Sequence, residues 1–308
     1  MKTMFTRKLA KKGFVVNGLL LLIALVSMAA TSRLGDTSRR ATGDTTVQQL
    51  NFDTLLLKLN GASESDRLNA PAISLNKQAA IYVSDYITRN TELLQEIELK
   101  SSKYFKITDA VFRKYGLPVE LKYLAVIESE LNTKARSHVG ARGAWQLMPE
   151  TARDLSLKIT SKYDERLHFY KSTVAAAKYI RDLYRIFDDW LLVIAAYNGG
   201  PGKVFDAMKK SGSRDFWKLQ NYLPAETRGH VKKFISTHYY FEGKGSVTTL
   251  TRAEVISFRK LMEDYVAKQN TALKEKDTVV NTTPAIAGTE TVIVKAAGAG
   301  ESKSTNEN

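Results

Sequence analysis

Apolar side chains recur three and four residues apart along most of the chain between residues 73 and 265. This spacing places them on one face of an α-helix, and it is repeated from one segment to the next. No stretch alternates apolar and polar residues convincingly enough to predict a strand. The chain has no cysteine, so disulfides and thiolate metal sites are excluded and packing must hold the fold. We therefore predict an all-α protein with a single helical domain over residues 73–245.

Local capping signals predict where several helices begin and end. The predicted N-terminal signals are Ser172 or Thr173, Asp188 or Asp189, and Pro224. A glycine run after Asn198 predicts a helix end, because glycine adopts the backbone conformation that terminates helices. Thr251 and Glu254 have the spacing of a capping box, so we expect an accessory amphipathic helix over residues 250–276, without chemistry of its own.

The first thirty residues predict the compartment. Five lysines and arginines precede an apolar run that ends in small residues, which is the pattern of an export signal. The run is slightly short for a membrane span, so residues 1–30 are either a cleaved signal peptide or a membrane anchor. We expect export to the periplasm or cell envelope, a polar tether over residues 31–72 and a disordered tail over residues 277–308.

The net charge of +14 favours polyanionic partners. Export argues against nucleic acid and leaves acidic lipid surfaces or an anionic cell-wall polymer. Membrane association through the N-terminal segment stays possible, and we expect a monomer.

Glu128 is the residue that breaks the helical pattern. Pro118 favours a helix that begins at Val119, and the apolar stripe of this helix is Leu121, Leu124, Ile127 and Leu131. Glu128 falls on the same side. A carboxylate in apolar surroundings is costly unless it is paired or protonated, so its position points to chemistry.

Other catalytic chemistries find little support. The four histidines form no HExxH motif, and we expect no metal and no cofactor. Gly202 and Lys203 resemble the end of a phosphate-binding loop, but Val204 replaces the magnesium-binding hydroxyl. No serine lies in a G-x-S-x-G elbow.

Three separated motifs give the sequence a specific resemblance. They read ESELNTKARSHVGARGAWQLMPETA, then AAYNGGPGKV, then LPAETRGHV. In this order they resemble the catalytic core of lytic transglycosylases with the soluble-transglycosylase, lysozyme-like fold. The preceding segment LPVELKYLAVIES is similar to the D branch of the membrane-bound lytic murein transglycosylases. The similarity extends from about Ile73 to Tyr240.

The resemblance implies a role for each matching residue. Glu128 would be the catalytic acid and base, supported by Ser129. The implied substrate-binding residues are Ser129, Ser137, Trp145, Gln146, Tyr197, Asn198 and Glu226. Local sequence alone also allows core packing for Trp145 and Tyr197, a backbone contact for Gln146 and a helix-start role for Glu226. His230 stands where this family often has a tyrosine, which puts that contact in doubt.

The implied reaction is non-hydrolytic cleavage of peptidoglycan. Glu128 would protonate the oxygen between N-acetylmuramic acid and N-acetylglucosamine and then take the proton of the 6-hydroxyl, which closes a 1,6-anhydro ring. A hydrolase needs a second carboxylate about 5–9.5 Å from the first, and the sequence gives no obvious one. The acidic residues considered are Asp154, Asp164, Glu165, Asp188 and Asp189. A muramidase hydrolase and an inactive wall-binding protein are the alternatives.

Overall fold

A computed structural model describes residues 69–281. The predicted export segment (1–30), most of the tether (31–72) and most of the tail (277–308) lie outside this range. The α-helices are α3 (Lys77–Arg89), α4 (Thr91–Lys114), α5 (Tyr123–Ser129), α6 (Pro149–Asp154), α7 (Phe169–Phe187), α8 (Trp190–Gly199), α9 (Pro201–Ser211), α10 (Phe216–Leu219), α11 (Ala225–Glu242) and α12 (Arg252–Asn281). The 3₁₀ helices are η1 (Val119–Lys122), η2 (Glu165–Leu167), η3 (Gln220–Tyr222) and η4 (Val247–Thr249).

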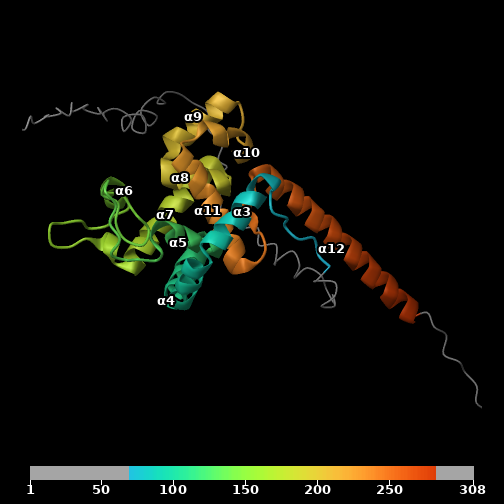
Figure 1. Cartoon of the computed structure of the whole chain (residues 1–308). Helices are drawn as coiled ribbons and strands as arrows, with labels where there is room; N and C mark the ends of the chain where they lie inside the picture. Colours follow the sequence, from blue (N-terminus) through green and yellow to red (C-terminus); the bar gives the residue numbers. More distant parts are fainter. Residues whose placement is uncertain (1–68, 282–308) are drawn as a thin grey trace, which may run out of the picture. The chain divides into compact units, whose positions relative to one another are not determined.

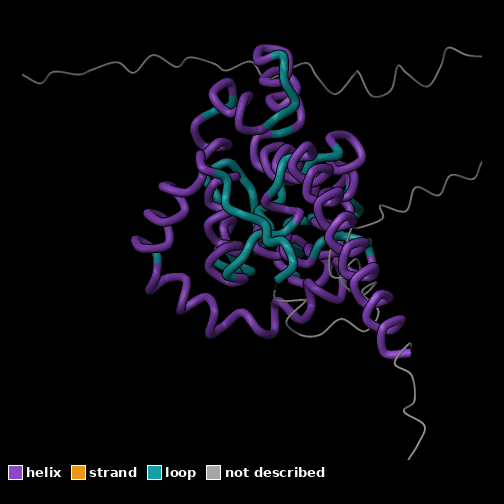
Figure 2. Tube along the Cα trace, turned by 90° about the vertical axis from the view of Figure 1, so that its right-hand side faces the viewer, coloured by secondary structure: helices purple, strands orange, loops and turns teal. Residues whose placement is uncertain are grey.

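The predicted all-α class is confirmed over the described residues. Helices make up most of the trace in Figure 2, and residues 69–281 contain isolated bridges but no strand. No helix within this range is long and apolar enough to cross a membrane.

Helix α8 forms the centre of the core. Every residue from Trp190 to Ala196 is buried, as expected for a helix that is apolar on all sides. It packs against α7, α9 and α11 (Figure 1). Asp189 caps α8 by accepting a hydrogen bond from the Leu192 amide at 3.1 Å, and Gly200 ends it at φ 84°. Both ends of α8 therefore lie where the sequence predicts them.

Helix α7 begins earlier than predicted. Its N-cap is His168, so the assignment of Ser172 or Thr173 as the cap is wrong. Both hydroxyls are buried and donate to the Phe169 carbonyl one turn back. Serine and threonine hydroxyls inside a helix commonly donate hydrogen bonds to a carbonyl one turn back. A serine or threonine at this position is therefore compatible with the helix interior as well as with its start.

Helix α12 starts as predicted but ends later. The Thr251 amide donates to Glu254 at 2.7 Å, and the Glu254 amide donates to the Thr251 hydroxyl at 3.3 Å. This is the reciprocal capping box that the spacing predicts. The helix continues to Asn281, so residues 277–281 are helical and the predicted tail boundary at 277 is wrong. No glycine or proline interrupts residues 252–281, and nothing in that stretch forces an earlier end.

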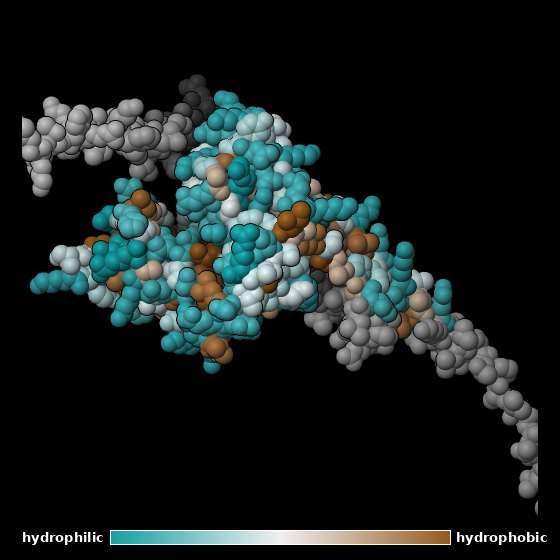
Figure 3. Space-filling view, viewed as in Figure 1, coloured by the Kyte–Doolittle hydropathy of each residue, from teal (hydrophilic) through white to brown (hydrophobic). Residues whose placement is uncertain are grey.

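Polar and apolar side chains are mixed on the visible surface. The face in Figure 3 is mostly hydrophilic, with apolar side chains in small separate groups. Along α12, Ile256 and Leu261 are exposed whereas Met262 is buried. Apolar side chains of α12 therefore lie both toward solvent and in buried positions.

Candidate active site

Glu128 lies in the last turn of α5, at the end of a short helical segment. The segment begins at Val119 as predicted, but its first turn is the 3₁₀ helix η1, and α5 follows from Tyr123. Leu121 and Leu124 are fully buried and fix the segment against the core. The Glu128 side chain is 15% exposed, so the carboxylate lies at the edge of the core, as its spacing predicts.

The turn after Glu128 has an unusual backbone. Glu130 and Leu131 have φ values of 56° and 63°, a region that non-glycine residues seldom adopt. The Leu131 amide still donates to the Ala125 carbonyl at 3.2 Å, and the Leu131 side chain is buried. This left-handed turn ends α5 directly behind Glu128 and returns the chain to the core.

His230 is the hydrogen-bonding partner of Glu128. Its Nε2 lies 2.9 Å from Glu128 Oε1, across 102 residues of sequence. His230 lies on α11, is 7% exposed, and its buried Nδ1 has no partner within the described residues. Among the residues that the structure describes, the Glu128 carboxylate forms this hydrogen bond and no other. The site therefore contains a carboxylate–imidazole pair with acceptor capacity left on the carboxylate.

Two predicted site residues hold the loop beside Glu128, which consists of residues 130–148 between α5 and α6. The Ser129 hydroxyl donates to the Ala144 carbonyl at 2.9 Å, and the Tyr197 hydroxyl donates to the Trp145 carbonyl at 2.7 Å. These adjacent carbonyls tie the loop to α5 and α8 together. Burial raises the pKa of Tyr197 well above its ordinary value, and the charge of Glu128 adds to this increase. Tyr197 therefore stays a neutral donor close to the catalytic candidate.

The loop keeps its shape through residues of its own. Gln146 has φ 45°, and its side-chain amide donates to the Gly143 carbonyl at 2.8 Å. Gly143 has φ 78°, and a Cβ there would lie 2.0 Å from the Arg166 carbonyl oxygen, so only glycine fits. Ser137 accepts a hydrogen bond from the Ala141 amide at 2.9 Å. Each of these polar contacts lies within the loop.

Trp145 is a correction to the predicted set. Its side chain is fully buried, its indole nitrogen donates to the Thr173 hydroxyl at 2.9 Å, and its ring packs on Phe112. A sugar cannot stack on a ring that is inside the core. The apolar ring of Trp145 packs between helices. The backbone carbonyl of Trp145 accepts the hydrogen bond from Tyr197.

The two remaining predicted residues occupy different positions. Asn198 accepts a hydrogen bond from the Thr227 hydroxyl at 2.9 Å, which joins the end of α8 to the start of α11. Gly199 passes so close that a Cβ would lie 2.7 Å from the same hydroxyl. Glu226 is exposed in the first turn of α11 and forms no hydrogen bond or ion pair with the other described site residues. The structure thus gathers Glu128, Ser129, Tyr197 and the loop, and adds His230.

The acidic residues that could have acted as a second carboxylate are mostly engaged in structural contacts. Asp164 binds Arg166 and Arg142, Glu165 binds Lys171, and Asp188 binds Arg252. Asp189 is buried and bonds two backbone amides. Asp154 alone of the five is exposed without an ion pair in the described range. No group of three metal-binding side chains occurs among the side chains of residues 69–275.

A family comparison agrees with this geometry. Residues 107–220 match the model of the transglycosylase SLT domain. This segment is a transglycosylase SLT domain. It includes Glu128, the loop and the Tyr197–Asn198 pair, whereas Glu226 and His230 lie after it and α3 lies before it.

Individual relatives extend the similarity beyond the SLT domain. The chain is 38% identical over 153 residues to membrane-bound lytic murein transglycosylase D of Escherichia coli K12, which covers 48% of this chain and 33% of the relative. It is 32% identical over 144 residues to the soluble lytic murein transglycosylase of Salmonella typhimurium, covering 42% and 22%. This chain thus spans about one third or less of these two relatives. The solved 70 kDa soluble lytic transglycosylase of E. coli matches with a TM-score of 0.40 and 28% identity, over 47% of this chain and 26% of that one.

His230 is the functional candidate that sequence reasoning treated as a departure. It follows the SLT domain by ten residues, and its contact with Glu128 depends on how α11 packs against α5. The available signal was its place after Glu226 and Thr227, where the family often has a tyrosine. Histidine, like tyrosine, can form a hydrogen bond with a carboxylate, so its occurrence at this position indicated a contact with Glu128.

Proposed function

We propose that this chain is a peptidoglycan lytic transglycosylase in which Glu128 acts first as an acid and then as a base. The observation that carries the proposal is the bonding of Glu128. It is largely withdrawn from water, yet it makes one hydrogen bond, to His230 at 2.9 Å. A carboxyl group with a free oxygen at the edge of an apolar core can both donate and accept a proton.

The reaction follows from that arrangement. Protonated Glu128 gives its proton to the oxygen between N-acetylmuramic acid and N-acetylglucosamine as the bond from this oxygen to the muramic acid C1 breaks. The acetamido oxygen of the substrate stabilises the positive charge at C1. The Glu128 carboxylate then takes the proton of the muramic acid 6-hydroxyl while O6 bonds to C1. The products are a 1,6-anhydro end and a free 4-hydroxyl on the glucosamine, and no water is consumed.

The other residues serve this step by position. Tyr197 and Ser129 hold the Ala144–Trp145 carbonyls, so the loop that carries Gln146 and Ser137 stays beside Glu128. We assign Gln146, Ser137, Asn198 and Glu226 to the sugar chain. His230 orients the carboxylate, so a histidine can take the place of the family's usual tyrosine. No metal or cofactor is needed.

The structural contacts of four of the five acidic candidates favour transglycosylation over hydrolysis. An inverting or retaining hydrolase pairs its acid with a second carboxylate. Four of the five acidic candidates have structural partners, and engaged groups of this kind are poorly placed to activate water. The anionic polymer also suits the +14 charge of the chain. We place the enzyme in the cell envelope, exported through residues 1–30 and associated with a membrane if that segment is retained.

Product analysis tests the proposal. Purified peptidoglycan digested with the full chain should yield anhydromuramic ends, each lighter by one water than a reducing end, by mass spectrometry. Glu128→Gln should lower turnover by at least about 10²–10⁴-fold while glycan binding persists. The matched control is Asp154→Asn, which should keep full activity. Reducing ends that depend on Asp154 would instead identify a muramidase, and no cleavage by the unchanged chain would identify a wall-binding protein.

A further inference from the structure

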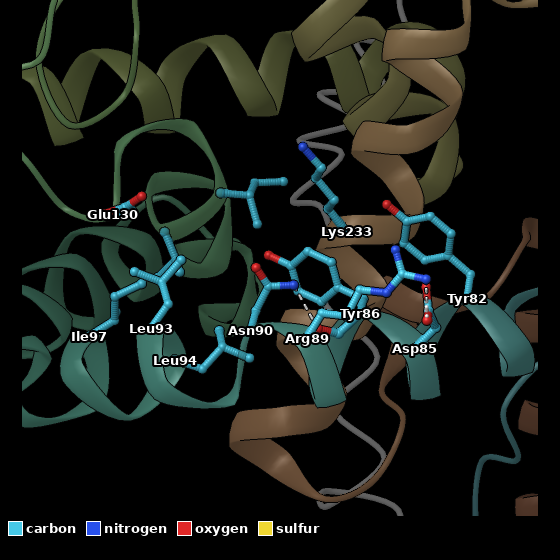
Figure 4. Close-up of a pocket in the computed structure, with 12 residues that line it drawn as sticks. Tyr82, Asp85, Tyr86, Arg89, Asn90, Leu93, Leu94, Ile97, Glu130 and Lys233 are labelled. Carbon is cyan, nitrogen blue, oxygen red and sulfur yellow. Dashed lines mark hydrogen bonds and ion pairs between the residues drawn. The ribbon is translucent and has the colours of Figure 1, made fainter.

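Helix α12 carries an apolar stripe that is separate from the pocket near Glu128. That pocket, drawn in Figure 4, is lined mainly from α3, α4, α5 and α11. The stripe consists of Val255, Met262 and Val266, which share one side of α12 because they are seven and four residues apart. Met262 is 1% exposed and Val266 is 8% exposed, but neither belongs to the hydrophobic core that the described residues form around α8. Among those residues, α12 makes no extended contact with another helix, so the described helices do not account for this burial.

The chain before α3 reaches the start of α12. Asn76 Nδ2 donates a hydrogen bond to Glu254 Oε1 at 3.0 Å. Ile73 lies against Gly245, where an added Cβ would be 2.4 Å from Ile73 Cγ2, and Leu75 packs against the core. Both large apolar side chains of residues 69–76 thus have partners of their own. Figure 1 shows this stretch, in blue, close to the first turns of α12, so the segment that precedes it begins near the stripe.

The preceding segment contains a sequence typical of a short amphipathic helix. Residues 51–61 read NFDTLLLKLNG. Four large apolar residues recur at spacings of three and four, which places them on one face of a helix. They are Phe52, Leu55, Leu56 and Leu59. Asn51 is a favourable N-cap and Gly61 a favourable C-terminal cap. A helix shorter than about 12 residues is marginal in water, so this sequence needs an apolar surface to fold against.

The segment and the stripe fit each other in reach and in polarity. Residues 62–68 connect the segment to the described chain and extend up to about 23 Å, whereas the stripe from Val255 to Val266 is about 16 Å long. Arg259 lies within the stripe, and its buried Nε has no hydrogen-bonding partner in the described part of the chain. A buried donor is costly unless an acceptor reaches it. Asp53 flanks the apolar face of the segment, and its carboxylate is such an acceptor.

These observations identify one occupant for the stripe. We propose that residues 51–61 pack on α12 as a short helix, with their apolar face on Met262 and Val266 and with Asp53 at Arg259. The occupant is thus a segment of the same chain and not a second copy or another protein. The inference concerns α12 and does not depend on the proposed reaction.

This contact would shorten the tether. The predicted tether would be fixed to the helical domain near its middle. If residues 1–30 are retained in a membrane, residues 31–50 alone separate that anchor from the domain and reach about 70 Å at most. Residues 31–68 would reach about 130 Å. The stripe would thereby roughly halve the distance from the membrane at which the domain can work.

The first test uses a single introduced thiol, because the chain has no cysteine. In the full chain, Met262→Cys should react with N-ethylmaleimide at least about tenfold more slowly than Lys260→Cys, since a buried thiol reacts only after local opening and Lys260 is exposed. Adding Leu56→Glu to Met262→Cys should remove this protection. Leu57→Glu is the matched control, because it makes the same substitution on the opposite face of the predicted helix and should leave the protection unchanged. Val266→Cys replaces Met262→Cys if that chain does not fold.

The second test reads the same contact from the segment. Met262→Glu should speed amide hydrogen exchange in residues 51–61 at least about tenfold, as measured by mass spectrometry of the full chain, and Lys260→Glu should not. Protection of the thiol that survives Leu56→Glu, or exchange that is equal in the two glutamate variants of α12, overturns the proposal. Protection that grows with protein concentration would identify a second copy as the cover and overturns it as well. Neither measurement requires cleavage of glycan, so failure of the proposed reaction would leave both results unchanged.

Discussion

Two carboxylates of this protein are both withdrawn from water but are bonded in opposite ways. The Asp164 side chain is 5% exposed, and Arg166 and Arg142 place guanidinium nitrogens 2.8 and 3.0 Å from it. The Arg166 backbone amide adds another bond at 3.1 Å. The Glu128 side chain is 15% exposed and has His230 alone within the described residues. Asp164 is saturated with donors, and Glu128 keeps capacity for a substrate.

The difference separates a structural charge from a reactive one. Burial alone would raise the pKa of Asp164, but the hydrogen bonds and charge of Arg166, with the bond from Arg142, hold that pKa below its ordinary value. Arg166 also donates to the carbonyls of Gly140 and Leu147, so the pair supports the loop that faces Glu128. A permanently ionised group fixes geometry, whereas a proton shuttle needs a group that can change its charge.

Removing Asp164 should have the largest effect on stability. Asp164→Ala leaves the Arg166 cation buried without compensation, which should lower the free energy of unfolding by about 3–5 kcal/mol. Urea denaturation measures this value, and Asp164→Asn gives a milder second variant if the alanine chain does not fold. Asp182→Ala is the control, because its exposed pair with Arg185 should contribute at most about 1 kcal/mol. Equal effects at the two positions would contradict the structural role of Asp164.

Asp189 and Asp164 give a second contrast, because both are buried and their pKa values are shifted in opposite directions. Burial raises the pKa of Asp189 from 3.8 to about 6, although backbone amides of Arg252 and Leu192 counteract it. The native state therefore holds a proton that the unfolded chain releases between about pH 4 and 6. The stabilising contribution is complete below about pH 4 and is lost as pH rises to 6, by about 3 kcal/mol in total. Asp164 contributes with the opposite sign, because its stabilisation is lost as pH falls.

Denaturation curves between pH 4 and 7 test this sign. Asp189→Asn cannot titrate, so its free energy of unfolding should fall less with rising pH than that of the unchanged chain. Asp188→Asn is the matched control, because that neighbour is half exposed in its pair with Arg252 and should leave the slope unchanged. A slope that is identical in all three chains would contradict a raised pKa at Asp189.

The sequence predicted those features that depend on nearby residues. Spacing alone placed Glu128 beside the buried Leu121 and Leu124, because an α-helix fixes which residues share a face. Capping chemistry placed the start of α8 at Asp188 or Asp189, of which Asp189 is the cap, and the start of α12 at Thr251. Each of these signals acts over seven residues or fewer, so the local sequence contains it.

Features that depend on packing between distant segments were missed or misjudged. The Glu128–His230 contact joins residues 102 positions apart, and no local periodicity specifies which residue of α11 faces α5. Trp145 could have been core or surface until the facing Thr173 was known. Ser172 and Thr173 looked like caps because their hydroxyls are equally suited to bonds inside a helix. Tertiary partners decided the first two cases, and hydrogen bonds within α7 decided the third.

Substitution of His230 should have the smallest of these effects, and it tests whether the single hydrogen bond of Glu128 orients its carboxylate. If His230 orients the carboxylate through its Nε2, His230→Leu removes the bond and should lower kcat about tenfold, which is near the contribution of a hydrogen bond to a charged group. His230→Gln places an amide nitrogen close to the same point and should recover most of the rate. KM should change little in either variant, because the contact acts through Glu128 and not on the sugar. Steady-state digestion of soluble glycan strands measures both constants. If leucine and glutamine reduce kcat equally, the imidazole serves packing, and Glu128 then has its orientation from α5 alone.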